Sequence, residues 1–371
     1  MHTRHTRTPS PSSHAPPSAS PVPVAGPQPA RTLPVRVLGL DVTATPGPRK
    51  PLTLAVCDLA PGKGTAPDNG MPDMPGAAPV LTLHELRELP TLDDLDRLFG
   101  GQLDAGFTGG HVAPDAGWVL GIDAALAQPL ELVEQLDWPR DWAGYAALCG
   151  AMDRAAFRDL LRGVSAARPA GQKYLYRACC RRAGAASPMN TVRPPVALMF
   201  HAVAPRLAAH EVHVPLLRPL PPCPLHNARV ALETYPGWLA RHLIGRAPYK
   251  GGDATDRAAR RNIRTDLLRG LAGLAGQLGG TPPDAAAAPV PRTGLPARMP
   301  RLTIRWNADH AARMLDDPEA DLLDALLCAV LAALSSLRPG YGLPERSAPP
   351  HGVTAAQLDV EGWIAGLPPE E

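Results

Sequence analysis

The sequence predicts an α/β protein in which a central sheet is layered against helices. Short apolar runs bounded by Gly and Pro, which are typical of buried strands, occur early in the chain and recur in its middle. Longer segments with apolar residues at helical spacing separate and follow them. The order of three strands that begin with a hairpin, a helix, a strand, helices, a strand and helices differs from a uniform βα alternation. With 371 residues and 45% hydrophobic content, the chain can form a large buried core.

The first part of the chain is predicted to begin with a disordered tail and to continue with most of the sheet. Residues 1–34 contain no acidic or aromatic residue and are rich in Pro and Ser, so we expect them not to fold and to have at most weak anion affinity from arginines such as Arg31. The strands are expected at 35–44, 51–59, 80–86 and 117–126. A flexible insertion is expected at 61–79, and a helix over 91–99 begins after Thr91, a suitable N-cap residue.

The second part is predicted to be mainly helical. Residues 139–210 have helical spacing and are interpreted as an inserted helical layer of a domain that spans 35–367. The remaining predicted elements are a strand at 228–236, helices at 237–244 and 253–279, a Pro/Ala-rich linker at about 280–300, helices at 307–316 and 318–337, and a short strand at 361–366.

Composition limits the classes of partner. The 37 Lys and Arg against 35 Asp and Glu give a formal charge of +2, so a nucleic acid would need a local basic patch rather than bulk attraction. The six cysteines have no CxxC spacing and are predicted to be free thiols. No secretory h-region and no uninterrupted apolar run of membrane-spanning length occurs, so a cytoplasmic protein without membrane contact is predicted.

Four carboxylates occupy positions where burial is costly. Asp41, Asp123 and Glu233 each end an apolar, strand-like run, and Asp324 lies within the apolar helix DLLDALLCAVLAAL. Strand-end acids project from a sheet edge, where ligands bind in open α/β sheets. If these acids converge, a pair of divalent cations would stabilise their ionised forms, and hard oxygen ligands favour Mg²⁺ or Mn²⁺. Asp321, one turn before Asp324, is an alternative or additional ligand.

A structural interpretation of the same acids stays open. Acids at strand ends often cap the next helix or accept hydrogen bonds from turn amides. Asp58 also ends an apolar run, LAVCDLA, and is expected to be a solvated hairpin residue. The pattern of strand-end acids is therefore consistent with a metal site and with structural capping.

Several motifs in order resemble a known family. VLGLDVTATP, GWVLGIDAALAQP, VALETYP followed by APYK, DLLDALLCAVLAAL and EGWI resemble the domain-of-unknown-function family numbered 429, a family of predicted ribonuclease-H-like nucleases. The resemblance covers about 35 to 365. It implies a ribonuclease-H-like mixed central sheet flanked by helices, with acids on the first strand, a middle strand, a later strand and a C-terminal helix.

By position, the resemblance assigns these roles to Asp41, Asp123, Glu233 and Asp324. The chain departs from the expected pattern at Ala125, where a Pro or a bulkier residue is expected, so Asp123 is the least firmly assigned of the four. The implied mechanism is hydrolysis of a phosphodiester with two metal ions. In the APYK motif, Lys250 would contact a phosphate, or it is a solvated loop lysine.

Two basic segments are candidate substrate-binding surfaces. Arg257, Arg260, Arg261 and Arg264 share one face of the helix at 253–279, where they either follow a nucleic-acid backbone or are simply solvated. The segment KYLYRACCRRAG (173–184), which includes Arg177, combines residues that stack on bases and pair with phosphates. Helical spacing there would instead bury the tyrosines and expose the arginines.

The sequence therefore predicts a metal-dependent nuclease or phosphodiesterase, and it leaves open whether the substrate is RNA, DNA, a hybrid of the two or a small phosphodiester. A non-catalytic protein of the same fold that binds nucleic acid or another protein is the alternative. An ATP-dependent phosphotransferase is a third possibility, against which the lack of a Gly-rich phosphate loop beside the first strand counts.

Overall fold

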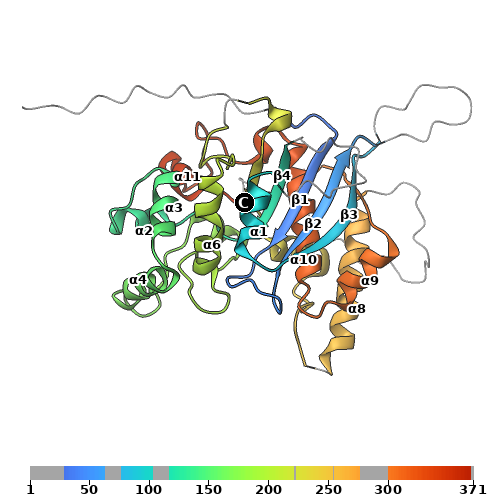
Figure 1. Ribbon diagram of the computed structural model, residues 1–371, viewed down its shortest axis with the longest axis horizontal. Helices are drawn as coiled ribbons and strands as arrows, with labels where there is room; N and C mark the ends of the chain where they lie inside the picture. Colours follow the sequence, from blue (N-terminus) through green and yellow to red (C-terminus); the bar gives the residue numbers. More distant parts are fainter. Residues whose placement is uncertain are drawn as a thin grey trace, which may run out of the picture.

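The computed structural model describes residues 29–62, 77–102, 117–220, 223–253, 255–275 and 300–368. It confirms an α/β protein with a six-stranded mixed sheet of order β5-β4-β1-β2-β3-β6 (Figure 1). The strands are β1 (Val35–Asp41), β2 (Leu52–Ala60), β3 (Val80–Leu89), β4 (Trp118–Asp123), β5 (Val230–Glu233) and β6 (Thr303–Arg305). Strand β2 pairs antiparallel with both β1 and β3. Strand β4 is parallel to β1, β5 is parallel to β4, and β6 is parallel to β3.

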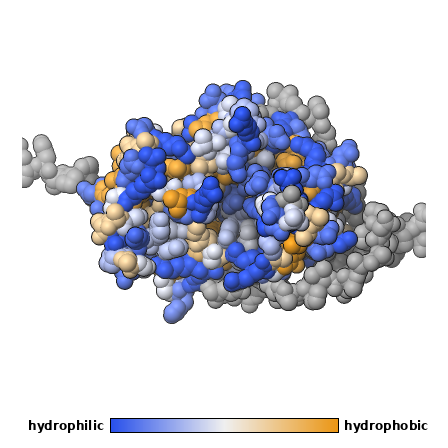
Figure 2. Space-filling model, turned by 90° about the horizontal axis from the view of Figure 1, so that it is seen from below, coloured by the Kyte–Doolittle hydropathy of each residue, from blue (hydrophilic) through white to orange (hydrophobic). Residues whose placement is uncertain are grey.

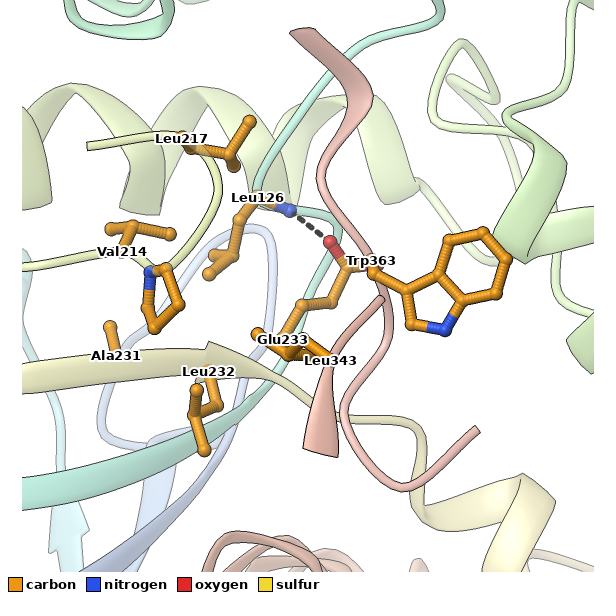
Figure 3. A pocket seen from close by; sticks show the side chains of 9 residues that line it. Leu126, Val214, Leu217, Ala231, Leu232, Glu233, Leu343 and Trp363 are labelled. Carbon is orange, nitrogen blue, oxygen red and sulfur yellow. Dashed lines mark hydrogen bonds between the residues drawn. The ribbon is translucent and has the colours of Figure 1, made fainter. Parts of the chain in front are cut away.

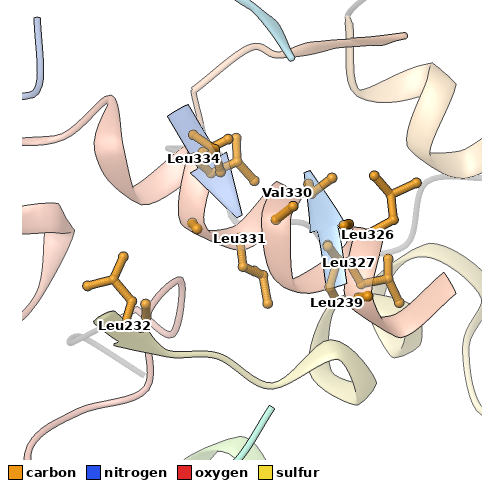
Figure 4. Close-up of a cluster of buried hydrophobic side chains, with 14 of the residues drawn as sticks. Leu232, Leu239, Leu326, Leu327, Val330, Leu331 and Leu334 are labelled. Atoms are coloured by element: carbon orange, nitrogen blue, oxygen red, sulfur yellow. The ribbon is translucent and has the colours of Figure 1, made fainter. Parts of the chain in front are cut away.

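The two faces of the sheet bury different residues of the same strands. Side chains alternate along a strand, so Val35 and Val37 belong to one buried cluster and Leu38 and Leu40 to the other. The helix α10 (Asp321–Ser336) lies across the first face, where its leucines pack with residues of β5 and of α7 (Pro236–Ile244) (Figure 4). The opposite face packs against α1 (Leu92–Phe99) and α6 (Val196–Ala209).

The other helices form groups on either side of the sheet. In Figure 1, α2, α3, α4 and α11 gather at one side, and α8 and α9 lie together at the other. These helices are α2 (Leu130–Gln135), α3 (Trp142–Ala151), α4 (Arg154–Ala166), α5 (Ala178–Ala183), α7 (Pro236–Ile244), α8 (Asp256–Ala272), α9 (Ala308–Asp316) and α11 (Ala355–Glu361). Thr91 forms a capping box with Asp94 at the start of α1, as its position in the sequence predicts.

Some predicted elements are wrong. Residues 361–366 form no strand, because α11 ends at Glu361 and irregular backbone follows. The strand β6 was not predicted, since three residues are too few for a pattern of alternation to be visible. Arg31 is not part of a disordered tail, because it is buried and donates hydrogen bonds to the backbone oxygens of Leu225 and Ala228. Most of the predicted tail, of the insertion at 61–79 and of the linker at 280–300 lies outside the described residues.

The surface and the cysteines agree with the composition. All six cysteines are free, and five of them are buried. The face shown in Figure 2 is mostly hydrophilic, carries hydrophobic residues in separate small groups and is hollowed near its centre. Within the described residues, no helix has the length and apolar character needed to cross a membrane.

Candidate metal centre

Three aspartates from distant parts of the sequence meet at one place in the fold. Asp41 and Asp123 end neighbouring parallel strands and are direct partners in their register. Asp324 lies in the first turn of α10, which crosses the same face of the sheet. One carboxylate oxygen from each of the three lies within 4.8 Å of the others. We call Asp41, Asp123 and Asp324 the acid triad.

Two glycines allow α10 to come this close. Gly39 and Gly121 are register partners, each two residues before the aspartate of its strand, and so lie on the same face of the sheet. A Cβ atom on Gly39 would lie 2.0 Å from the backbone oxygen of Ala325, and one on Gly121 would lie 2.3 Å from that of Cys328. Any larger residue would push the helix away and separate Asp324 from the two strand aspartates.

Lys250 and Tyr249 are bound to the buried member of the triad. The hydroxyl of Tyr249 donates a hydrogen bond of 2.9 Å to Oδ1 of Asp324. The ammonium of Lys250 forms an ion pair with Oδ2 of the same carboxylate. Asp324 is fully buried, whereas the side chain of Lys250 is 44% exposed. The lysine therefore approaches the triad from the solvent side.

When all three carboxylates are ionised, the triad carries more negative charge than the ammonium of Lys250 neutralises. Burial, and then the charges of Asp324 and Asp123, raise the pKa of Asp41 well above its usual value. Burial also raises the pKa of Asp123 to about 7, with Lys250 opposing and Asp324 adding to this shift. The pKa of Asp324 is raised by burial despite its contact with Lys250. Three carboxylates that face one ammonium are a hard oxygen donor set that fits a divalent cation such as Mg²⁺ or Mn²⁺.

Glu233 does not join the triad. Its register partner on β4 is Ile122, the residue before Asp123, so its side chain points to the opposite face of the sheet. There its Oε2 accepts hydrogen bonds of 2.8 Å from the backbone amide of Leu126, shown in Figure 3, and from the guanidinium of Arg177. The second guanidinium nitrogen of Arg177 contacts Oε1. The sequence identifies Glu233 as a strand-end acid, and in the structure its carboxylate forms a buried ion pair with Arg177.

Arg177 is not available to a phosphate in this structure. Its side chain is 1% exposed and donates to Glu233 and, at 2.9 Å, to the backbone oxygen of Glu361. Residues 173–177 precede the short helix α5, so the predicted helix does not include the tyrosines. The expectation that helical spacing exposes this arginine is therefore wrong.

Sequence reasoning missed Glu361 as a buried acid. Its Oε1 accepts a hydrogen bond of 3.0 Å from the amide of Leu130, and its Oε2 accepts one of 3.1 Å from the amide of Ala178. The sequence contains one signal for this buried acid, because Glu361 is followed by the apolar residues of the EGWI motif. We call Arg177, Glu233 and Glu361 the arginine network. It connects β5, α11, the loop after β4 and α5.

A small pocket borders this network. It is lined by apolar residues, including Leu126, Leu217 and Trp363, together with Glu233 (Figure 3). The carboxylate of Glu233 is already hydrogen-bonded, so the pocket offers little polar chemistry to a ligand.

The other candidate residues lie outside the triad. Asp321 starts α10 and is partly buried, and it is not among the three acids that converge. On α8, Arg257 and Arg261 are exposed, as predicted, and Arg261 pairs with Asp316. Arg264 departs from the predicted basic face, because it is buried and its guanidinium donates to backbone oxygens, including that of Tyr249 at 2.9 Å.

Asp58 is buried rather than solvated. It lies on the interior strand β2, is 2% exposed, and contacts Arg36 at 3.7 Å and His84 at 3.3 Å. Arg36 is its register partner on β1, so the ion pair forms directly across two strands. The strand β2 continues past Asp58 to Ala60, so this acid lies inside the strand although it ends an apolar run in the sequence.

Comparisons of this chain with family models, with curated proteins and with solved structures find no match. The family resemblance thus remains a prediction carried by the motifs. The mixed α/β sheet and the convergence of three aspartates are independent of that resemblance, because they come from the geometry of the chain itself.

Proposed function

We propose that this protein is a divalent-cation-dependent phosphodiesterase, acting as a nuclease, with a ribonuclease-H-like fold. The observation that carries the proposal is the acid triad, in which Asp41, Asp123 and Asp324 bring three carboxylate oxygens within 4.8 Å of one another. Carboxylates at this spacing repel one another when ionised, and a divalent cation between them removes that repulsion.

The arrangement of the sheet supports the proposed fold. The chain begins with three antiparallel strands and continues with strands parallel to the first. Acids on the first strand, on a middle strand and on a C-terminal helix match the order that the family resemblance implies. The acid of the later strand, Glu233, lies on the other face, so the proposed donor set consists of the three aspartates.

The proposed chemistry assigns different tasks to the residues of the site. Asp41, Asp123 and Asp324 would hold Mg²⁺ or Mn²⁺. When bound, such a cation lowers the pKa of a coordinated water and stabilises negative charge on a phosphoryl oxygen. Tyr249 orients Asp324 through its hydrogen bond, and the partly exposed ammonium of Lys250 is placed to bind a phosphate oxygen of the substrate.

Cleavage of a defined panel of nucleic acids tests the proposal. Labelled single-stranded, double-stranded, hybrid and branched substrates are incubated with Mg²⁺ or Mn²⁺ and either the native chain or Asp41→Asn. We expect cleavage by the native chain and a loss of at least about 100-fold in the variant, because even residues that only support metal ligands contribute about 10–100-fold.

A matched variant separates this effect from a general loss of charge. Asp159→Asn removes an exposed acid of α4 that pairs with its neighbour Arg158 and does not belong to the triad. This variant should cleave the substrates like the native chain. Equal cleavage by Asp41→Asn and the native chain would contradict the proposal. A folded native protein that binds the panel without cutting it would favour the non-catalytic alternative.

A further inference from the structure

Lys250 supplies the positive charge next to the acid triad. Of the ion pairs between described residues, only the pair from Lys250 to Asp324 reaches the triad. The carboxylate is fully buried and the lysine side chain is 44% exposed. A cation that extends inward from solvent thus contacts an acid that solvent does not reach.

Three hydrogen bonds fix the backbone around Lys250. The guanidinium of Arg260 donates to the backbone oxygen of Lys250, and that of Arg264 donates to the backbone oxygen of Tyr249 at 2.9 Å. The amide of Gly251 donates to the backbone oxygen of Pro318 at 2.8 Å. Movement of the ammonium therefore needs only rotation about the side-chain bonds of the lysine, without movement of the segment that carries it.

Asp324 keeps its orientation without the lysine. Its second oxygen accepts the hydrogen bond from Tyr249, and its amide donates a helical hydrogen bond to the backbone oxygen of Ala320 at 2.9 Å. Loss of the ammonium would leave Oδ2 without its ion-pair partner, on a carboxylate that has one oxygen within 4.8 Å of oxygens of Asp41 and Asp123.

We propose that Lys250 is a displaceable counter-ion of the metal centre. Its ammonium neutralises Asp324 while the triad holds no divalent cation, and a divalent cation competes with it for the same carboxylate. Charge repulsion then directs the displaced ammonium outward, where it binds a phosphate oxygen of the substrate. This inference rests on the proposed function, and it adds that metal loading and exposure of the phosphate-binding lysine are coupled.

Titration with Mn²⁺ in the absence of substrate is the first test. Calorimetry compares the native chain with Lys250→Met and with the control Lys173→Met, which removes an exposed lysine that forms no ion pair with the triad. We expect Lys250→Met to bind Mn²⁺ about tenfold more tightly, since it removes the competing cation, and Lys173→Met to bind like the native chain. Equal or weaker binding by Lys250→Met would overturn the inference.

Chemical modification of lysines tests displacement directly. Native protein is treated with an acylating reagent with and without Mn²⁺, and mass spectrometry follows Lys250 and Lys173. We expect Mn²⁺ to increase the modification rate of Lys250 several-fold and to leave Lys173 unchanged, because an amine released from an ion pair is more reactive. An unchanged or slower rate at Lys250 would overturn displacement.

The results also separate this inference from the proposed function. If none of the three proteins binds Mn²⁺, both the metal centre and the counter-ion are overturned. If the native protein cleaves nucleic acid with Mn²⁺ while the reactivity of Lys250 does not change, the nuclease function stands and the counter-ion is overturned.

Discussion

The acid triad and the arginine network are two clusters of carboxylates withdrawn from solvent, and the strand-end acid of the network, Glu233, points to the face of the sheet opposite the triad. In the arginine network, Glu233 is bound by the guanidinium of Arg177 and a backbone amide, and Glu361 accepts two backbone amides. In the triad, three carboxylates face one ammonium, which contacts only one of them. Each carboxylate of the first cluster is bound by donors of the chain, although burial still raises the pKa of Glu361, whereas among the described residues only Asp324 of the triad has an ion pair.

This difference shows which property of a buried acid points to function. A position at the end of an apolar strand is common to Asp123 and Glu233, so this position does not separate a ligand from a structural residue. The missing compensation does separate them, because a fold does not retain mutually repelling carboxylates for stability. The triad is therefore expected to gain stability from a cation, whereas the network is expected to lose stability when one of its members is removed.

Arg177→Met should have the largest effect on stability. It leaves Glu233, which is 7% exposed, without its charged partner, and breaking a buried pair in this way costs about 3–5 kcal/mol. Denaturant unfolding of the variant and the native chain measures the difference. A change below about 1 kcal/mol would contradict the structural role assigned to the network.

The metal-free protein should lose stability as pH rises. The folded-state pKa of Asp123 is raised from 3.8 to about 7, so the folded protein binds more protons than the unfolded chain between these values. Stability is therefore greatest at low pH within this window and decreases as pH increases through about 7, by about 2–4 kcal/mol. Thermal melts in chelator from pH 5 to pH 8 test this, and Asp123→Asn should reduce the dependence. A stability that rises over this range would break the contrast between the clusters.

Divalent cations should stabilise one cluster only. At a free Mg²⁺ or Mn²⁺ concentration 100 times its dissociation constant, the folded state gains about 2.7 kcal/mol. The gain should be lost in Asp324→Asn and kept in Glu361→Gln, provided that the latter variant is folded before the cation is added. The melting temperature of each variant is measured with and without the cation. An equal loss of cation-induced stabilisation in both variants would contradict the proposed difference between the two clusters.

Asp41→Asn should have the smallest effect and the opposite sign to Arg177→Met. Without metal, the variant replaces a carboxyl group whose ionisation is opposed by burial and by the charges of Asp324 and Asp123, so at pH 8 we expect it to be more stable than the native chain by about 0.5–2 kcal/mol. Glu233→Gln serves as the comparison from the other cluster and should be destabilised. Denaturant unfolding of both variants in chelator measures the pair, and destabilisation of Asp41→Asn would show that the triad is compensated after all.

The sequence by itself determined the fold class, most strands and a set of candidate acids that includes the three of the triad. Alternation and apolar runs are local patterns, so β1, β2, β4 and β5 were located to within a few residues. The apolar surroundings of Asp324 were also visible, since helical periodicity places its neighbours in the core. The glycines two residues before Asp41 and Asp123, in the repeated VLGLD and VLGID, are a further signal that the sequence contains.

Only the tertiary structure decided which acids share a site. Asp123 and Glu233 look alike in the sequence, but the register of β4 with β5 pairs Glu233 with Ile122 and so places the two acids on opposite faces. The tertiary structure also turns the side chain of Arg177 inward, where it binds the carboxylate of Glu233 and the backbone oxygen of Glu361. Register depends on pairing between distant segments, and a shift of one residue reverses the face of every side chain in a strand, so no local pattern determines it.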